Sequence, residues 1–117
     1  MKRDLALGAL LLAGTFLVSL AASAATVLTA KNGMTVYIFD NDAGGTPTCY
    51  ADCGKKWPPY LAKGGGKMGE GWATVKRNDG RLQWTYDGKP LYFYSADKKK
   101  GDKAGDGIGG VWHIVSE

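Results

Sequence analysis

The feature that most constrains the fold is an aromatic motif that occurs twice. Residues 37–42 (YIFDND) and 92–97 (YFYSAD) share the order tyrosine, any residue, aromatic, two residues, aspartate. When Tyr37 is aligned with Tyr92, the two halves match without a gap, and the further identical pairs are Gly33 with Gly88, Gly54 with Gly109, and Trp57 with Trp112. These identities predict an internal duplication in which neither half can bury its apolar face alone.

The motif itself is predicted to be structural. In a strand, Tyr37 and Phe39 share one face, as do Tyr92 and Tyr94, and each aromatic side chain buries about 150–250 Å². The aspartate that follows each strand is expected to close a local turn by accepting hydrogen bonds from N–H groups. The residues assigned this structural role are Tyr37, Phe39, Asp42, Tyr92, Tyr94, Asp97 and Trp112.

Residues 1–24 have the features of a secretory signal peptide. A basic start at Lys2 and Arg3 precedes an uncharged apolar stretch, residues 5–20, and small residues then lead to a cleavage site after Ala24 or Ala25. This stretch is shorter than the ~20 residues that span a bilayer. We therefore expect a mature chain that is not embedded in the membrane, in the periplasm or secreted from the bacterial cell envelope.

Residues 25–117 are expected to form one small domain. The whole chain carries a net charge of +4, and removing Lys2, Arg3 and Asp4 leaves +3. The one basic run, residues 98–100, does not make the coherent basic face that nucleic acid requires, so no nucleic-acid partner is expected. The mild excess of positive charge permits an attraction to acidic surface polymers.

Three turn signals, Asn32-Gly33, Asn78-Asp79-Gly80 and Asp87-Gly88, separate segments rich in Val, Thr and aromatic residues. They predict one hairpin, a three-stranded meander and a closing strand. The predicted strands are residues 26–29, 35–39, 72–76, 82–86, 91–94 and 110–115. The fold class is therefore a small antiparallel all-β domain of two degenerate repeats, residues 26–62 and 81–117, joined by a Gly-rich loop and a strand.

Alternation adds detail to one strand of the meander. Leu82, Trp84 and Tyr86 fall on one face, predicted to be buried, and Gln83 and Thr85 fall on the other face, predicted to meet solvent.

One short helix is predicted near the two cysteines. Residues 48–57 can form about two turns, with Thr48 as N-cap and an end imposed by the Pro-Pro pair that follows. Cys49 and Cys53 are the only cysteines, and in an exported protein an even count favours a disulfide.

Taken together, these motifs resemble a family of secreted proteins with a Yx(FWY)xxD motif, described as predicted lipoproteins or as a secreted repeat of unknown function. The matching elements are YIFDND at 37–42, the C-x-x-x-C-x-x-x-W-P-P run at 49–59, YFYSAD at 92–97, and GGVWH at 109–113. The resemblance covers residues 33–115 and implies no activity. No cysteine follows the apolar N-terminal stretch, so lipid anchoring is not implied for this chain.

A metal or thiol-redox centre is the alternative function. Cys49, Cys53 and His113, with Met34 or Met68 as a soft ligand, would suit copper or zinc if the thiols stayed reduced. A calcium site is a weaker option, because the Asp-rich segments 40–42 and 102–107 do not follow the EF-hand order.

A non-enzymatic binding module is the leading hypothesis. The chain has no G-x-S-x-G motif and few serines beyond the signal peptide, so no enzyme and no cofactor are predicted. Aromatic side chains beside Pro-rich or Gly-rich loops could stack on a glycan or hold an envelope protein, or they could cover the edge of the core. These binding candidates are Tyr50, Trp57, Tyr60 and Trp72.

Overall fold

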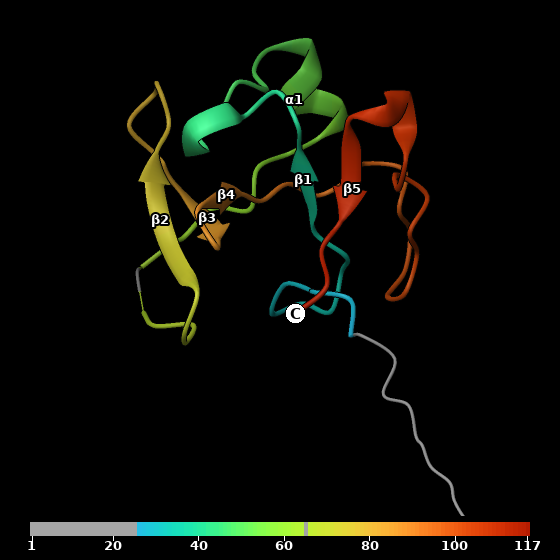
Figure 1. Cartoon of the computed structure of the whole chain (residues 1–117), viewed down its shortest axis with the longest axis horizontal. Helices are drawn as coiled ribbons and strands as arrows, with labels where there is room; N and C mark the ends of the chain where they lie inside the picture. Colours follow the sequence, from blue (N-terminus) through green and yellow to red (C-terminus); the bar gives the residue numbers. More distant parts are fainter. Residues whose placement is uncertain (1–25, 65) are drawn as a thin grey trace, which may run out of the picture.

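The computed structural model describes residues 26–64 and 66–117, so the predicted signal peptide lies outside the described residues. The fold consists of two small antiparallel sheets, one with order β1-β5 and one with order β2-β3-β4 (Figure 1). This architecture confirms the all-β prediction. In the described part of the chain, no helix combines the length and the apolar character needed to cross a bilayer.

The three-stranded sheet is the predicted meander, with one change at its end. β2 (Trp72–Lys76) pairs with β3 (Leu82–Tyr86), and β3 pairs with the short strand β4 (Lys89–Pro90). The Asp87-Gly88 turn between β3 and β4 has positive φ at both residues, 49° and 78°, as a tight hairpin requires. The predicted strand 91–94 is wrong, because the chain leaves this sheet after Leu91 and pairs elsewhere.

The two-stranded sheet joins the two repeats. β1 (Tyr37–Phe39) pairs with β5 (Trp112–Ile114), in the register Tyr37 with Ile114 and Phe39 with Trp112. The predicted hairpin between residues 26–29 and 35–39 is reduced to a bridge between Thr29 and Thr35. The first aromatic strand therefore takes its partner from the opposite repeat, and Phe39 comes to lie opposite Trp112.

The helix is shorter than predicted. α1 (Asp52–Lys56) begins after Ala51, and Thr48 is not its cap. The Thr48 hydroxyl instead donates to Asp42 Oδ1 at 2.7 Å. Two short 3-10 helices, η2 (Ala43–Gly45) and η3 (Ile108–Gly110), complete the elements.

Two hydrophobic clusters form the core. One, beside the three-stranded sheet, contains Leu28, Ala30, Val36, Ala62, Trp84 and Leu91. The other, which holds the repeated motif, contains Tyr37, Cys49, Trp57, Tyr92 and Trp112.

The prediction of a solvated face on β3 is wrong. Gln83 is fully buried and Thr85 nearly so, whereas Leu82 is 41% exposed. The buried amide is satisfied, because Gln83 Nε2 donates to the carbonyl oxygen of Leu91 at 2.7 Å and Gln83 Oε1 accepts from Arg77 Nη1 at 2.6 Å. Partners from neighbouring segments thus allow both faces of β3 to be covered.

Candidate functional site

The two copies of the motif meet at the centre of the molecule. Tyr37 and Tyr92 exchange both main-chain hydrogen bonds, with N···O distances of 2.8 and 3.0 Å. Both residues are fully buried. The two aromatic segments therefore lie side by side, and the sequence repeat becomes a repeat in space.

Each tyrosine hydroxyl donates a hydrogen bond to the aspartate of the other repeat. Tyr37 donates its hydroxyl hydrogen to Asp97 Oδ2, and Tyr92 donates to Asp42 Oδ2, each at 2.7 Å. The other oxygen of each aspartate accepts a loop N–H of its own repeat, from Thr48 for Asp42 and from Ala104 for Asp97. These loop bonds span six and seven residues, so they are not the local turns predicted from sequence.

The environment of the two tyrosines keeps them protonated. Burial is the main effect that raises the pKa of Tyr37, and its hydrogen bond to Asp97 raises it further. Burial and the bond to Asp42 raise the pKa of Tyr92 in the same way. Both hydroxyls are therefore fixed donors to carboxylates, which is a structural role.

Four aromatic rings form a continuous stack that alternates between the repeats. The order is Phe39, Trp112, Trp57 and Tyr94, with centroid separations of 4.1, 3.7 and 4.3 Å. The two tryptophan rings at its centre are parallel within 3°. Each repeat contributes every second ring, so neither half could build this stack alone.

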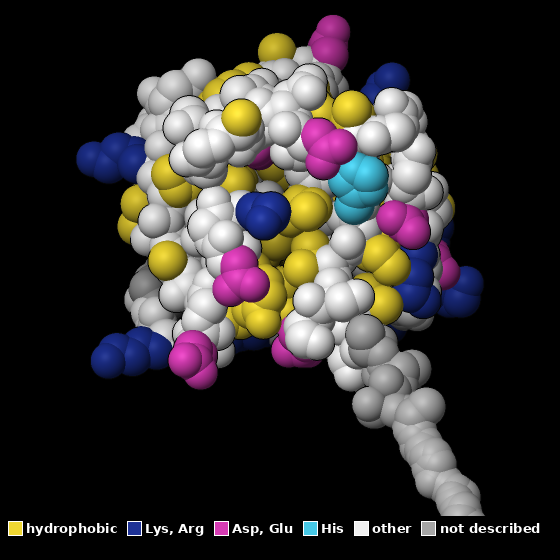
Figure 2. Space-filling view, viewed as in Figure 1, with side chains coloured by type: hydrophobic (Ala, Val, Ile, Leu, Met, Phe, Trp, Pro, Cys, Tyr) yellow, Lys and Arg dark blue, Asp and Glu magenta, His cyan; other side chains and the backbone are white. Residues whose placement is uncertain are grey.

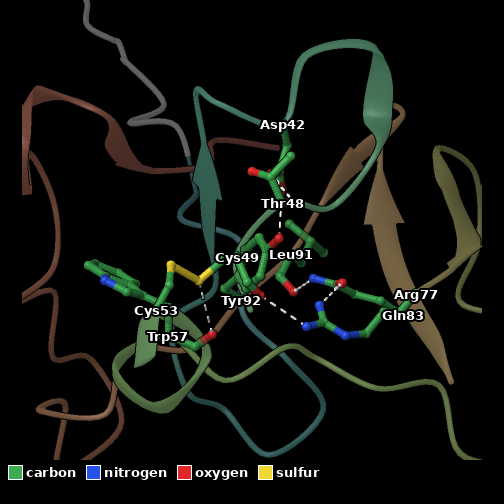
Figure 3. The surroundings of a disulfide bond; sticks show 9 residues. All are labelled: Asp42, Thr48, Cys49, Cys53, Trp57, Arg77, Gln83, Leu91 and Tyr92. Carbon is green, nitrogen blue, oxygen red and sulfur yellow. Dashed lines mark hydrogen bonds between the residues drawn. A yellow bond between two sulfur atoms is a disulfide. The ribbon is translucent and has the colours of Figure 1, made fainter. Parts of the chain in front are cut away.

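The predicted disulfide between Cys49 and Cys53 is present, with Cα atoms 5.2 Å apart. Figure 3 shows how it connects to the core: the Cys49 carbonyl oxygen accepts from Arg77 Nη2 at 3.0 Å. The Arg77 guanidinium also lies over the Tyr50 ring, 4.3 Å from its centroid. The loop that carries the disulfide is thus held against the buried side of β3.

This disulfide leaves no thiol to bind a metal. His113, the third candidate ligand, instead has its Nε2 atom 2.9 Å from Asp40 Oδ2. Among the residues that the structure describes, no three His, Cys, Asp or Glu side chains form a group able to hold a metal ion. In the Asp-rich segment 102–107, Asp102 accepts hydrogen bonds from the backbone of Lys98 and Lys99.

The four aromatic binding candidates separate into three environments. Trp57 is only 4% exposed, so its prediction as a surface residue is wrong; the ring belongs to the central stack. Tyr50 is half-buried beneath Arg77. Tyr60 and Trp72, also half-buried, come together at 6.3 Å between ring centroids, with their planes nearly perpendicular.

Tyr60 and Trp72 border two adjoining cavities that share Trp84 as a common wall. Trp72, on β2, and Trp84, on β3, line a cavity of about 390 Å³, with Met68 and Lys67 from the Gly-rich loop. Tyr60 and Trp84 line the second cavity, of about 240 Å³. We call these two cavities together the aromatic groove. Trp84 is only 6% exposed, as alternation predicts for the buried face of β3.

A third cavity, of about 460 Å³, opens between β1, η2 and the turn before β4. Its floor is formed by Ile38 and Phe39, and three aspartates and one lysine line its wall. These elements lie near the middle of Figure 1, where Figure 2 shows hydrophobic side chains in a hollow with charged side chains at its rim. This cavity is therefore acidic in character.

Comparison with known proteins places both repeats in one family model. The model, described as "Secreted repeat of unknown function", matches residues 21–60 and again residues 73–116. The two matched segments contain the two aromatic motifs, which agrees with the repeat seen in the structure. Neither the curated proteins nor the solved structures give a match to this chain.

Proposed function

The chain belongs to the family of secreted repeats of unknown function, and from that premise we propose that it is an exported, non-enzymatic binding module of the cell envelope whose ligand is a glycan. The aromatic groove is the observation that supports this proposal. Export brings the protein into contact with the polysaccharides of the envelope, and the groove provides ring faces on which a sugar can stack.

The shape of the groove suits a small ligand. Its larger cavity, about 390 Å³, falls in the range of ligand pockets, which are mostly apolar with a few polar groups. Trp72 and Trp84 stand nearly perpendicular, at 89°, with their centroids 5.9 Å apart. Trp84 is only 6% exposed and packs against Trp72, so the half-buried Trp72 supplies the ring surface on which a sugar can stack.

The surface outside the groove is a poor match for a protein partner. A stable protein interface needs roughly 800 Å² from each side with an apolar centre. Among the described residues, only Leu82 and Ile108 are large hydrophobic side chains that are well exposed. A ligand held inside the groove agrees better with this surface than a flat apolar contact does.

The strands β2 and β3 fix the positions of Trp72 and Trp84 in the groove. Trp72 lies directly opposite Tyr86 in the β2–β3 pairing, and Thr74 lies opposite Trp84. Ring positions set by strand register are defined more closely than those set by loops. We therefore expect these two rings to move little when a ligand binds, whereas loop residues 66–69, which line the same cavity, can adjust.

A glycan screen with the mature chain tests the proposal. Tryptophan fluorescence should respond to the bound sugar, and Trp72→Ala should weaken binding by about tenfold or more, as loss of a stacking ring does. Ile108→Ala is the matched control, because Ile108 is exposed but does not line the groove.

Urea unfolding would first establish that both variants are folded. Two results would contradict the proposal: no glycan is bound at millimolar concentration, or folded Trp72→Ala binds as well as the parent chain.

A further inference from the structure

We infer that the aromatic groove selects an acidic polysaccharide, one whose sugar rings carry carboxylates. This inference rests on the proposed function, since it names the class of glycan that the same groove would take. Its evidence is the charge of the residues that line the groove.

Of the described residues that line the groove, three are lysines and none is acidic. Lys67 lines the larger cavity, and Lys31 and Lys63 line the smaller one. The contrast with the third cavity, where three aspartates meet one lysine, shows that charge on this small domain is segregated. A carboxylate on a ligand would meet complementary charge in the groove and repulsion at the third cavity.

The groove lysines are also available to a ligand. In the described stretches 26–64 and 66–117, the lysines that form salt bridges are Lys55 and Lys99, and neither lies in the groove. All three groove lysines are exposed. No internal carboxylate has to be displaced before a ligand carboxylate can bind.

Rings and charges adjoin along the groove. The backbone N–H of Lys31 donates to the Tyr60 hydroxyl at 3.2 Å, which places the end of the Tyr60 ring next to this lysine. Lys67 stands beside Trp72 in the lining of the other cavity. A polymer of uronic acids presents the matching pattern, a ring for stacking with a carboxylate attached to it.

Two probes with the same rings test the inference. Tetragalacturonate carries a carboxylate on each sugar, and its full methyl ester carries none. At low salt we expect the acid to bind about tenfold tighter than the ester, and we expect most of that preference to vanish when the salt is raised, because exposed charges are screened.

Substitutions then assign the preference to the three lysines. The triple variant Lys31→Gln, Lys63→Gln, Lys67→Gln should lose the preference and bind acid and ester with similar affinity. Lys89→Gln is the matched control, because it makes the same kind of charge change at the rim of the third cavity and should leave the preference intact.

The outcomes distinguish a failure of the acid preference alone from a failure of the proposed function. Equal binding of acid and ester by the parent chain overturns the acid preference and leaves the glycan proposal standing. An oligothymidylate of equal charge that binds as tightly as the acid shows that the groove does not select sugars, which overturns both. Binding of neither sugar probe nor of any glycan in the screen also overturns both.

Discussion

Removing one hydroxyl group tests whether the tyrosine–aspartate hydrogen bonds between the repeats stabilise the fold. Tyr37→Phe deletes the oxygen that donates to Asp97 Oδ2 at 2.7 Å and accepts from the buried N–H of Gly105 at 3.1 Å. A hydrogen bond to a charged group contributes about 1.5–3 kcal/mol, and an unsatisfied buried N–H costs about 1–3 kcal/mol. These two losses overlap, so we expect the free energy of unfolding to fall by about 3 kcal/mol.

Such a loss is large for a domain of this size. In a domain of about 60–100 residues, 1 kcal/mol shifts Tm by about 4–8 °C, so Tyr37→Phe should unfold roughly 12–24 °C below the parent chain. The assay is urea unfolding followed by tryptophan fluorescence, with an unchanged m value to show that only stability has changed. A cycle with Asp97→Asn should give a coupling of about 0.5–3 kcal/mol.

Tyr50→Phe supplies the matched control. The Tyr50 hydroxyl accepts from the exposed N–H of Asn78, which water can satisfy after the substitution, so stability should change by less than about 0.5 kcal/mol. The reasoning is refuted if Tyr37→Phe costs less than about 1 kcal/mol, or if Tyr50→Phe costs as much as Tyr37→Phe.

Three further predictions follow from other parts of the fold. Folding raises the pKa of both repeat tyrosines above the usual value near 10, so their contribution to the free energy of unfolding is complete below that pH. Above it, the contribution is lost by up to ~1.4 kcal/mol per pH unit for each tyrosine. The urea midpoint of unfolding should therefore fall with rising alkaline pH, and it should fall less steeply in Tyr37→Phe. Replacing Cys49 and Cys53 by alanine should lower the free energy of unfolding by about 2 kcal/mol, since the closed loop is short, and an unchanged urea midpoint would contradict this. Gly105→Ala should destabilise the fold by about 1–3 kcal/mol, because the new Cβ would lie 2.7 Å from Trp57 Cη2. Gly54→Ala, in α1, should stabilise it by ~0.5–1 kcal/mol, because the nearest atom to the new Cβ is the Cys49 carbonyl oxygen at 3.6 Å. Thermal unfolding of the two variants would show whether Tm shifts in opposite directions.

The repeat, the meander and the disulfide could be predicted because each leaves a local mark in the sequence. Asp87-Gly88 predicts a tight turn, and two cysteines in an exported chain predict a disulfide. The tyrosine–aspartate hydrogen bonds between the repeats have no such local signal in the sequence. The alignment of the two halves shows that Tyr37 corresponds to Tyr92 and Asp42 to Asp97, but it is satisfied equally by partners within one repeat and by partners across the two.

The burial of polar side chains on β3 could not be predicted from the sequence either. Alternation along β3 assumes that one face of the sheet meets water, and Gln83 contradicts it because Arg77 and the Leu91 carbonyl group satisfy its amide. The position of Trp57 directly before two prolines favours a surface residue. Its burial depends on stacking against Trp112, which belongs to the other repeat.

The hydroxyl bonds between the repeats also set the order in which the chain can fold. The amino-terminal half contains Tyr37 but neither Asp97 nor Gly105, the groups that its hydroxyl needs. Contacts this distant along the chain form late. We therefore expect the amino-terminal half to fold only when the carboxy-terminal half is present to supply both partners of the Tyr37 hydroxyl.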